Sequence, residues 1–241
     1  MPSGQKTLKI ENLHRNVSGG WLRPAVFGAM DGLVSNFALM IGVAGGTQAA
    51  GVENTKAIVL AGFAGLLAGA FSMAAGEYTS VASQAELAMA EIELEKKEIK
   101  EDINREIEEL AQVYVSRGVS KEVSLKFAQE LSKNEVEFID AHSLEEFGVS
   151  TKDLPSAKLA AVSSFISFGL GAMVPLLPYM LGFNNLTYSL IISLSGLFLT
   201  GAVVSLVTTR TWWYSGTRQL LIGSGAAAIT WILGNSIGSV L

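Results

Sequence analysis

The stretch that decides the fold runs from residue 57 to residue 101 and reads AIVLAGFAGLLAGAFSMAAGEYTSVASQAELAMAEIELEKKEIKE. Its first part, 57–83, is almost wholly apolar and exceeds the about 20 residues that a helix needs to cross a membrane. Its second part is dominated by Glu, Lys, Ala, Ile and Leu, most of which favour helices. No proline separates the two parts, so we predict a membrane-spanning helix that runs on into a polar helix.

Four further apolar stretches have the length of a membrane span. Pro175 and Pro178 should kink or end one of them near its far side, and a tight turn at 182–185 leads into the next. The segment 210–218, with two tryptophans and a tyrosine, is predicted to be an interfacial connection. With 49% hydrophobic and 16% charged residues, the sequence predicts an all-α membrane protein of five transmembrane helices, at 24–46, 57–83, 157–181, 186–208 and 217–240.

Charge is distributed unevenly along the chain. Residues 84–158 hold 18 acidic and 10 basic residues, a net charge of −8, whereas the rest of the chain has a net charge of +3. We therefore predict three parts: an N-terminal cytosolic segment with the first two spans (1–83), an acidic helical domain (84–156), and the last three spans (157–241).

The placement of Lys and Arg predicts the orientation. If the N-terminus is cytoplasmic, 16 of these residues lie inside and only Lys56 lies outside. Cytoplasmic segments of membrane proteins carry the excess of positive residues. The sequence thus predicts a multi-pass protein with its N-terminus inside, its C-terminus outside and the acidic domain in the cytosol.

The acidic insertion is predicted to be a small bundle of three helices, at 83–116, 121–131 and 135–147. The first lacks proline and glycine, and Gly118 should end it. The apolar stripe that should face the bundle core recurs at helical spacing. It consists of Ile92, Ile99, Ile103, Ile107 and Leu110.

Only two acidic residues, Asp31 and Glu77, lie within the predicted spans. A charge at bilayer depth costs about 2.5–3.5 kcal/mol on insertion scales, so such residues mostly line a polar pathway or pair with another group. No Lys or Arg lies deep in a predicted span to pair with them. We therefore predict that both belong to a transport pathway. The alternative is a protonated acid hydrogen-bonded to a neighbouring helix or, for Glu77, a place at the interface.

Neutral ligands accompany these carboxylates. Met73 precedes Glu77 by four residues and so shares its helix face, although a lone methionine is more often core filler. Ser35 and Asn36 follow Asp31 by about one turn and offer neutral oxygens. Carboxylate oxygen with thioether sulfur suits a borderline first-row cation better than magnesium or calcium.

The acidic helix carries a second set of possible ligands. Six carboxylates recur at a spacing of three or four residues, at Glu91, Glu95, Glu98, Asp102, Glu106 and Glu109. Like charges at this spacing destabilise a helix, and a bound cation would relieve the repulsion. The alternative is a solvated acidic face with ion pairs such as Glu93–Lys97 and Glu101–Arg105. His142 and Glu146, one turn apart, are weaker candidates for the same metal.

Several classes of function are excluded or disfavoured. The absence of cysteine excludes disulfides and thiolate metal sites. We find no phosphate-binding glycine loop, no nucleophile with a base and no zinc-protease pair, so we do not expect an enzyme. Basic residues are too few for a nucleic-acid surface.

The motifs resemble those of the vacuolar iron transporter family. The resemblance rests on Asp31-Gly32-Leu33 with the following 36–39, on the run 68–78 that ends in Met73-Ala-Ala-Gly-Glu77-Tyr, and on 83–86. The order of two spans, acidic insertion and three spans extends it over nearly the whole chain. Members of this family move ferrous iron, and often manganese, out of the cytosol in exchange for protons.

The resemblance implies a homodimer with a metal pathway between the two copies, lined by the first two spans. It implies that Asp31 is the transport aspartate and Met73 the pathway methionine, and that the insertion is a metal-binding domain. The domain glutamates of the family fall on Glu95, Glu98, Glu106, Glu109 and Glu146.

Two positions depart from the family pattern. A glutamate that plant members carry in the second span is Gly65 here, and Glu77 is a candidate replacement. The paired methionines of the plant domain fall on His142 and Ser143, so imidazole would replace sulfur as a ligand.

We therefore expect a proton-coupled exporter embedded in lipid, with Fe²⁺ as its cargo and Mn²⁺ as a second candidate cargo. Mn²⁺ and Zn²⁺ are further candidate ions for the cytosolic site. The alternatives are a transporter of another divalent cation (zinc, cobalt or nickel) and a membrane-bound metal sensor or scaffold. The compact loops favour a prokaryotic cell membrane over a vacuolar membrane.

Overall fold

The computed structural model describes residues 20–52, 54–206 and 210–240, and the regular elements in these ranges are helices. Lys6, Lys9, His14 and Arg15 lie outside the described residues. Five helices are long and apolar enough to cross a membrane, which confirms the all-helical class and the five predicted spans. In chain order the elements are α1 (Leu22–Ala49), α2 (Thr55–Glu101), α3 (Ile103–Ser116), α4 (Lys121–Leu131), α5 (Glu135–Glu146), α6 (Ala157–Met173), the 3₁₀ turn η1 (Val174–Leu176), α7 (Leu177–Met180), α8 (Leu186–Val204) and α9 (Trp212–Gly238).

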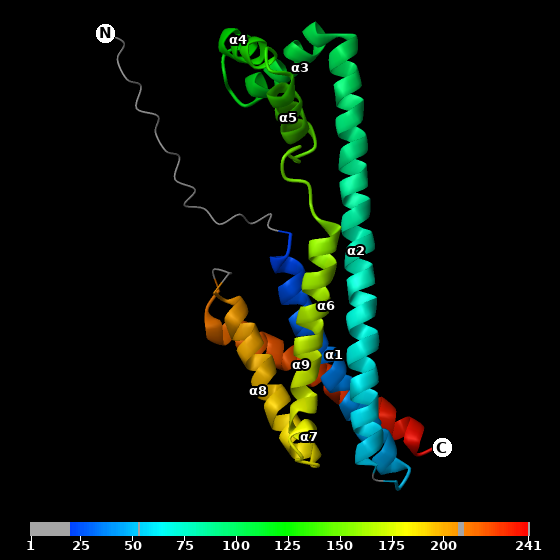
Figure 1. Cartoon of the computed structure of the whole chain (residues 1–241). Coiled ribbons are helices and arrows are strands. Elements are labelled where there is room, and N and C mark those ends of the chain that lie inside the picture. The colour runs from blue at the N-terminus through cyan, green and yellow to red at the C-terminus, as the bar shows by residue number, and fades with distance from the viewer. Residues whose placement is uncertain (1–19, 53, 207–209, 241) are drawn as a thin grey trace, which may run out of the picture.

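Helix α2 joins the apolar part of the molecule to its acidic part. Its 47 residues continue without a break from the second span into the polar segment, as predicted, and Asn54 caps its first turn. At 1.5 Å per residue such a helix is about 70 Å long, more than twice the hydrocarbon thickness of a membrane. In Figure 1, α1, α6, α8 and α9 lie at the level of the lower half of α2, and α3, α4 and α5 lie at the level of its upper end.

The prediction of one helix over 83–116 is wrong. The backbone of Asp102 adopts a non-helical conformation (φ −151°, ψ 81°) that ends α2, and the chain then turns into α3 (Figure 1). The carboxylate of Asp102 accepts a hydrogen bond of 3.2 Å from the backbone N–H of Arg105 and so caps α3. A well-placed N-cap residue competes with helix continuation, and here the packing of α3 against its neighbours favours the cap.

The predicted interfacial connection at 210–218 is largely helical. Helix α9 already begins at Trp212, after an extended Thr211, and includes Arg218. Aromatic residues at a membrane interface are compatible with a helix. They therefore indicate where the chain meets the membrane surface, not where a helix ends. The expected effect of the prolines is confirmed, because α6 gives way to η1 at Val174 and α7 ends at Met180.

The membrane helices pack closely through glycine. A Cβ on Gly171 of α6 would overlap the backbone carbonyl of Ala29 of α1, and a Cβ on Gly234 of α9 would overlap that of Gly42. Thr230 of α9 also donates a 2.8 Å hydrogen bond to the carbonyl of Ala38. Small residues let helix backbones approach where the hydrophobic effect does not drive association. Helix α1 is therefore held between α6 and α9.

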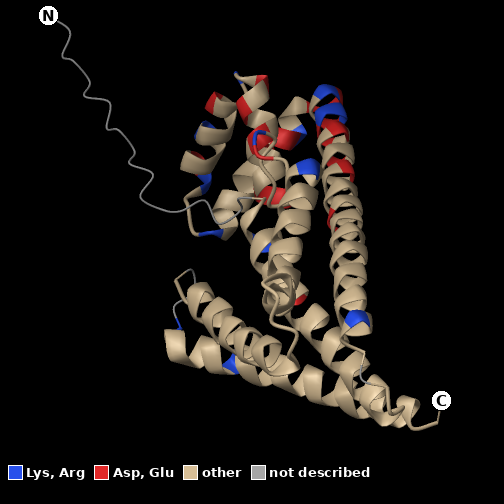
Figure 2. Cartoon of the chain, turned by 60° about the horizontal axis from the view of Figure 1, so that its bottom comes forward, with Lys and Arg blue, Asp and Glu red and all other residues tan. Residues whose placement is uncertain are grey.

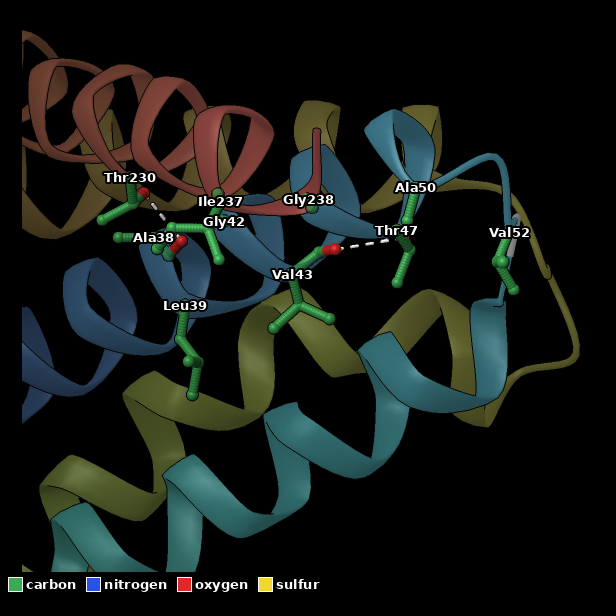
Figure 3. A pocket seen from close by; sticks show the side chains of 12 residues that line it. Ala38, Leu39, Gly42, Val43, Thr47, Ala50, Val52, Thr230, Ile237 and Gly238 are labelled. Carbon is green, nitrogen blue, oxygen red and sulfur yellow. Dashed lines mark hydrogen bonds between the residues drawn. The ribbon is translucent and has the colours of Figure 1, made fainter. Parts of the chain in front are cut away.

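A groove of about 460 Å³ lies where α1 and α9 cross (Figure 3). Its lining includes Leu39, Val43, Val52 and Ile237 and contains no titratable side chain. In a membrane such a surface offers contacts to lipid tails rather than to ions, so it is not a candidate for metal chemistry.

The acidic part has a core of its own. Seven buried side chains pack together between the end of α2 and helices α3 to α5, and they are Ile92, Ile99, Leu110, Ala111, Ala128, Phe138 and Ile139. Of the predicted stripe, Ile103 is 42% exposed, because it starts the new helix α3 after the break. Figure 2 shows that charged residues gather on these helices, whereas the membrane bundle is nearly free of them.

Candidate metal site

Two groups of side chains that share Glu95 converge between α2, α3 and α5. In the first, ligand atoms of Glu95, His142 and Glu146 all lie within 4.8 Å of one another. In the second, ligand atoms of Glu95, Glu98 and Glu106 do the same. We call these five residues the carboxylate cluster. The side chains of Glu95, Glu106 and His142 are at most 4% exposed.

The helix break at Asp102 builds this cluster. If α2 continued straight to residue 116, Glu106 would lie two turns beyond Glu98 on the same helix and could not face Glu95. Because the chain turns at Asp102, α3 packs back against α2 and buries Glu106 beside Glu95 and Glu98. Helix α5, capped by Asn134, adds His142 and Glu146 from the opposite side.

Three buried ligand atoms of the cluster, on Glu95 and His142, lack hydrogen-bond partners. Nδ1 of His142 lies 3.0 Å from Oε1 of Glu95 and 3.5 Å from Oε1 of Glu146. Despite the short first distance, Oε1 of Glu95 and both ring nitrogens of His142 make no well-oriented hydrogen bond. Buried polar groups are nearly always hydrogen-bonded, and the exceptions often mark an ion or a catalytic role. The arrangement therefore fits ligands that point at a shared cation.

Charge and burial shift the pKa values of two members. Burial by itself lowers the pKa of His142, but the carboxylates of Glu95 and Glu146 outweigh it, so the pKa is raised above 6.5. Burial, together with the negative charge of Glu95, raises the pKa of Glu146 above its usual value, although His142 opposes the shift. Both groups hold protons more tightly than free side chains do, and a metal must displace those protons.

Helix α5 is fixed in place by polar contacts outside the cluster. Arg117, after α3, forms a two-pronged ion pair with Glu145 of α5 and lies over the ring of Tyr114. Oδ1 of Asp140 accepts three bonds of 2.7 Å, from the hydroxyl of Ser150 and from the backbone N–H and hydroxyl of Thr151. These contacts orient the face of α5 that carries His142 and Glu146.

The structure does not bring together every predicted ligand. Glu91 is partly buried on α2 but lies outside both groups of ligand atoms, and the carboxylate of Asp102 caps α3, so neither residue joins the carboxylate cluster. Glu109 lies one turn beyond Glu106 and its charge reaches Glu146, but it is outside both groups of ligand atoms. The ion pairs also differ from prediction, since Glu93 pairs with Lys96 and Lys97 with Glu101.

One residue near the cluster is missed by the sequence analysis. Arg105, which was expected to pair with Glu101, instead contacts the carboxylates of Glu106 and Glu98. The pairing with Glu106 joins two neighbours in the sequence, whereas the contact with Glu98 depends on the turn between α2 and α3, which no spacing rule reveals.

The intramembrane candidates lie on α1 and α2. Asp31 and Glu77 are half-buried, and within the described part of the chain neither carboxylate forms an ion pair. Met73 packs against a small core of Ala70, Phe168 and Ala172, between α2 and α6. The structure thus supports the packing role of Met73 and leaves its role as a ligand a prediction.

Asn36 is the most enclosed polar residue of α1. Its side chain is buried, and its amide nitrogen donates a 2.6 Å bond to the carbonyl of Ala172, while its amide oxygen has no partner. A Cβ on Gly65 of α2 would lie 2.8 Å from that oxygen. Gly65 therefore directly faces the side chain of Asn36.

Comparison with known proteins places the chain among transporters. The vacuolar iron transporter 1 of Arabidopsis thaliana is 27% identical over 235 residues, which cover 96% of this chain and 92% of the relative. The vacuolar iron transporter of Acanthamoeba castellanii is 31% identical over 232 residues, covering 90% and 82%. Vacuolar iron transporter homolog 2.1 of Arabidopsis thaliana is 30% identical over 247 residues, covering 99% and 92%. The sequence model of the VIT family matches residues 22–235, and the chain therefore belongs to the VIT family.

Proposed function

We propose that this chain is a membrane transporter that moves ferrous iron, and also manganese, out of the cytosol in exchange for protons. The observation that carries the proposal is the carboxylate cluster, in which ligand atoms converge from three helices and the buried atoms of Glu95 and His142 have no hydrogen-bond partner. We propose iron as the transported metal because the relatives are named vacuolar iron transporters.

In this proposal the carboxylate cluster collects the metal. Glu95, Glu98, Glu106 and Glu146 offer oxygens that balance the charge of a divalent cation, and His142 offers an imidazole nitrogen. This mixed set suits first-row metals such as Fe²⁺ and Mn²⁺. Since Asp102, Glu91 and Glu109 lie outside the group, they act through charge and helix capping at most.

Helix α2 connects the carboxylate cluster, which collects the metal, to the residues proposed to carry it across the membrane. Glu95 and Glu77 lie on the same unbroken helix, about 27 Å apart along its axis at 1.5 Å per residue. Met73 is one turn further on, and Asp31 with Asn36 is supplied by α1. We infer that the ion passes from the cluster to these four residues, and that helices rock about them to alternate access.

Proton exchange follows from the chemistry of the ligands. A carboxylate binds a cation only when it is deprotonated, so each ion that binds at Asp31 or Glu77 releases protons and each ion that leaves allows them to return. Half-buried carboxylates without an ion-pair partner are suited to this exchange inside a membrane. Among the described residues, no basic residue stabilises the deprotonated form, so both the protonated and the deprotonated form are accessible.

The proposed unit is a homodimer with the acidic helices in the cytosol. Only 17% of the span of α2 is buried within one copy, which leaves most of its membrane surface for a second copy or lipid. The distribution of basic residues favours an N-terminus inside and a C-terminus outside.

A second candidate cargo has an observation in its favour. Imidazole nitrogen, as supplied by the buried His142, is a good ligand for zinc, cobalt and nickel as well as iron. The flux experiment should therefore include these ions as competitors.

The proposal is tested by Fe²⁺ flux into proteoliposomes with and without an imposed pH gradient. We expect gradient-driven flux in the wild type and its loss in Asp31→Ala, because the variant lacks the carboxylate that binds the ion. Glu122→Ala is the matched control, since it removes one acidic charge from an exposed position on α4. Folded protein without flux of iron or manganese would refute the transport proposal and favour the sensor alternative.

A further inference from the structure

Arg105 places a positive charge inside the carboxylate cluster. Its Nη2 and Nε atoms lie 2.7 Å and 3.0 Å from Oε1 of Glu106, and its Nη2 lies 3.5 Å from Oε2 of Glu98. Glu106 is 1% exposed, whereas the Arg105 side chain is 57% exposed. The guanidinium therefore reaches from the surface into the cluster and contacts two of the five residues proposed to hold metal.

These contacts solve a problem of the metal-free protein. Three carboxylates with oxygens within 4.8 Å repel one another, and one of them, Glu106, is fully buried. A buried charge without a partner is strongly destabilising. A guanidinium remains charged at any physiological pH, so it compensates the cluster whether or not protons are available.

The same contacts oppose metal binding. A divalent cation at the cluster would lie within a few ångströms of the guanidinium, because both use the carboxylates of Glu98 and Glu106. Like charges at such distances repel appreciably even with strong screening. The exposed side chain of Arg105 is the partner that has room to move away, since Glu106 is enclosed.

We propose that Arg105 is the built-in counter-cation of the metal-free cluster, and that it competes with the transported metal, weakening its binding and speeding its release. This inference rests on the proposed function, because it assumes that the cluster collects the ion. A collecting site must release its ion toward the membrane, and a permanently charged competitor favours release independently of pH.

The test is Fe²⁺ binding to the full-length protein in detergent, by equilibrium dialysis without oxygen, with dissociation followed by stopped-flow chelation. We expect Arg105→Gln to bind Fe²⁺ tighter by about tenfold and to release it more slowly, because the competing charge is gone. Lys97→Gln is the matched control. It removes the same charge from α2, but its partner Glu101, 3.8 Å away, is outside the cluster, so affinity should change by less than about twofold.

Arg105→Lys keeps a positive charge and so protects the fold if Arg105→Gln is unstable. An ammonium is a compact point charge without the planar fork of a guanidinium, so it competes less well for these carboxylates and Fe²⁺ binding should tighten by a smaller factor. Unchanged or weaker binding in both Arg105 variants would overturn the inference and make Arg105 a positioning residue for Glu106. That outcome leaves the proposed function intact. If instead Glu95→Gln bound Fe²⁺ as tightly as the wild type, the carboxylate cluster would not be the collecting site.

Discussion

At the scale of single residues, the candidate site depends on side chains that are buried without ordinary partners. His142 and Glu95 approach to 3.0 Å without a proper hydrogen bond, and Asn36 leaves its amide oxygen unpaired between α1 and α2. Such atoms are costly in a folded protein, so their occurrence at both proposed metal positions supports a ligand role.

The raised pKa values of His142 and Glu146 predict how metal binding depends on pH. Both residues must lose their protons to bind metal, and both hold them to a higher pH than usual. Fe²⁺ affinity should therefore begin to fall while the pH is still above 6.5, the ordinary value for histidine, and continue to fall as the pH is lowered.

Binding measured across this pH range checks the prediction. His142→Gln should flatten the upper part of the profile, because it removes the group that titrates there. Lys152→Gln is a suitable control on the same side of the domain, since Lys152 pairs with Glu137 outside the cluster. A profile that His142→Gln leaves unchanged would contradict the prediction.

At the scale of elements, close helix contacts set the geometry of the pathway. Helix α1 carries Asp31 and Asn36 and is held against α6 through Gly171, whose position leaves no room for a Cβ beside the carbonyl of Ala29. The neighbouring atom is backbone and cannot turn aside as a long side chain would.

Gly171→Ala should therefore lower the thermal stability of the purified protein and reduce Fe²⁺ flux, because α1 and α6 are forced apart. Gly169→Ala on the same helix is the matched control, since a Cβ there meets nothing within 4 Å. It should be neutral or stabilising by up to about 1 kcal/mol, as expected when alanine replaces glycine in a helix. Thermal unfolding in detergent measures both effects, and equal melting temperatures for the two variants would argue against the close contact.

At the scale of the whole molecule, one helix unites two environments. Helix α2 carries Glu77 in the membrane part and Glu95 in the cluster, so the position of the acidic domain is tied to that of the second span. Figure 1 shows this continuity as a single rod along the length of the molecule.

The proposed orientation is testable because the chain contains no cysteine. Ser120→Cys, before α4, should react with a membrane-impermeant maleimide only from the cytosolic side, and Asn184→Cys, before α8, only from outside. Labelling of intact and permeabilised cells measures this. The reverse pattern would invert the topology and the direction of transport.

The sequence alone determined the five spans, the helical character of the insertion, the continuity of α2 and the five residues that the structure brings into the carboxylate cluster. These features depend on local properties: long apolar runs must enter the membrane, and residues without breakers propagate a helix. The bounds of α4 were predicted without error for the same reason.

Only the tertiary structure decided which of these ligands meet. The break at Asp102 carries Glu106 back to Glu95 and Glu98, brings Arg105 onto the same carboxylates, and excludes Asp102 itself. The choice between a continued helix and a capped turn depends on long-range packing of α3 against α2, α4 and α5, whose energy is not contained in the local sequence. Residue spacing identified the carboxylates, but the burial of an apolar core determined their positions in space.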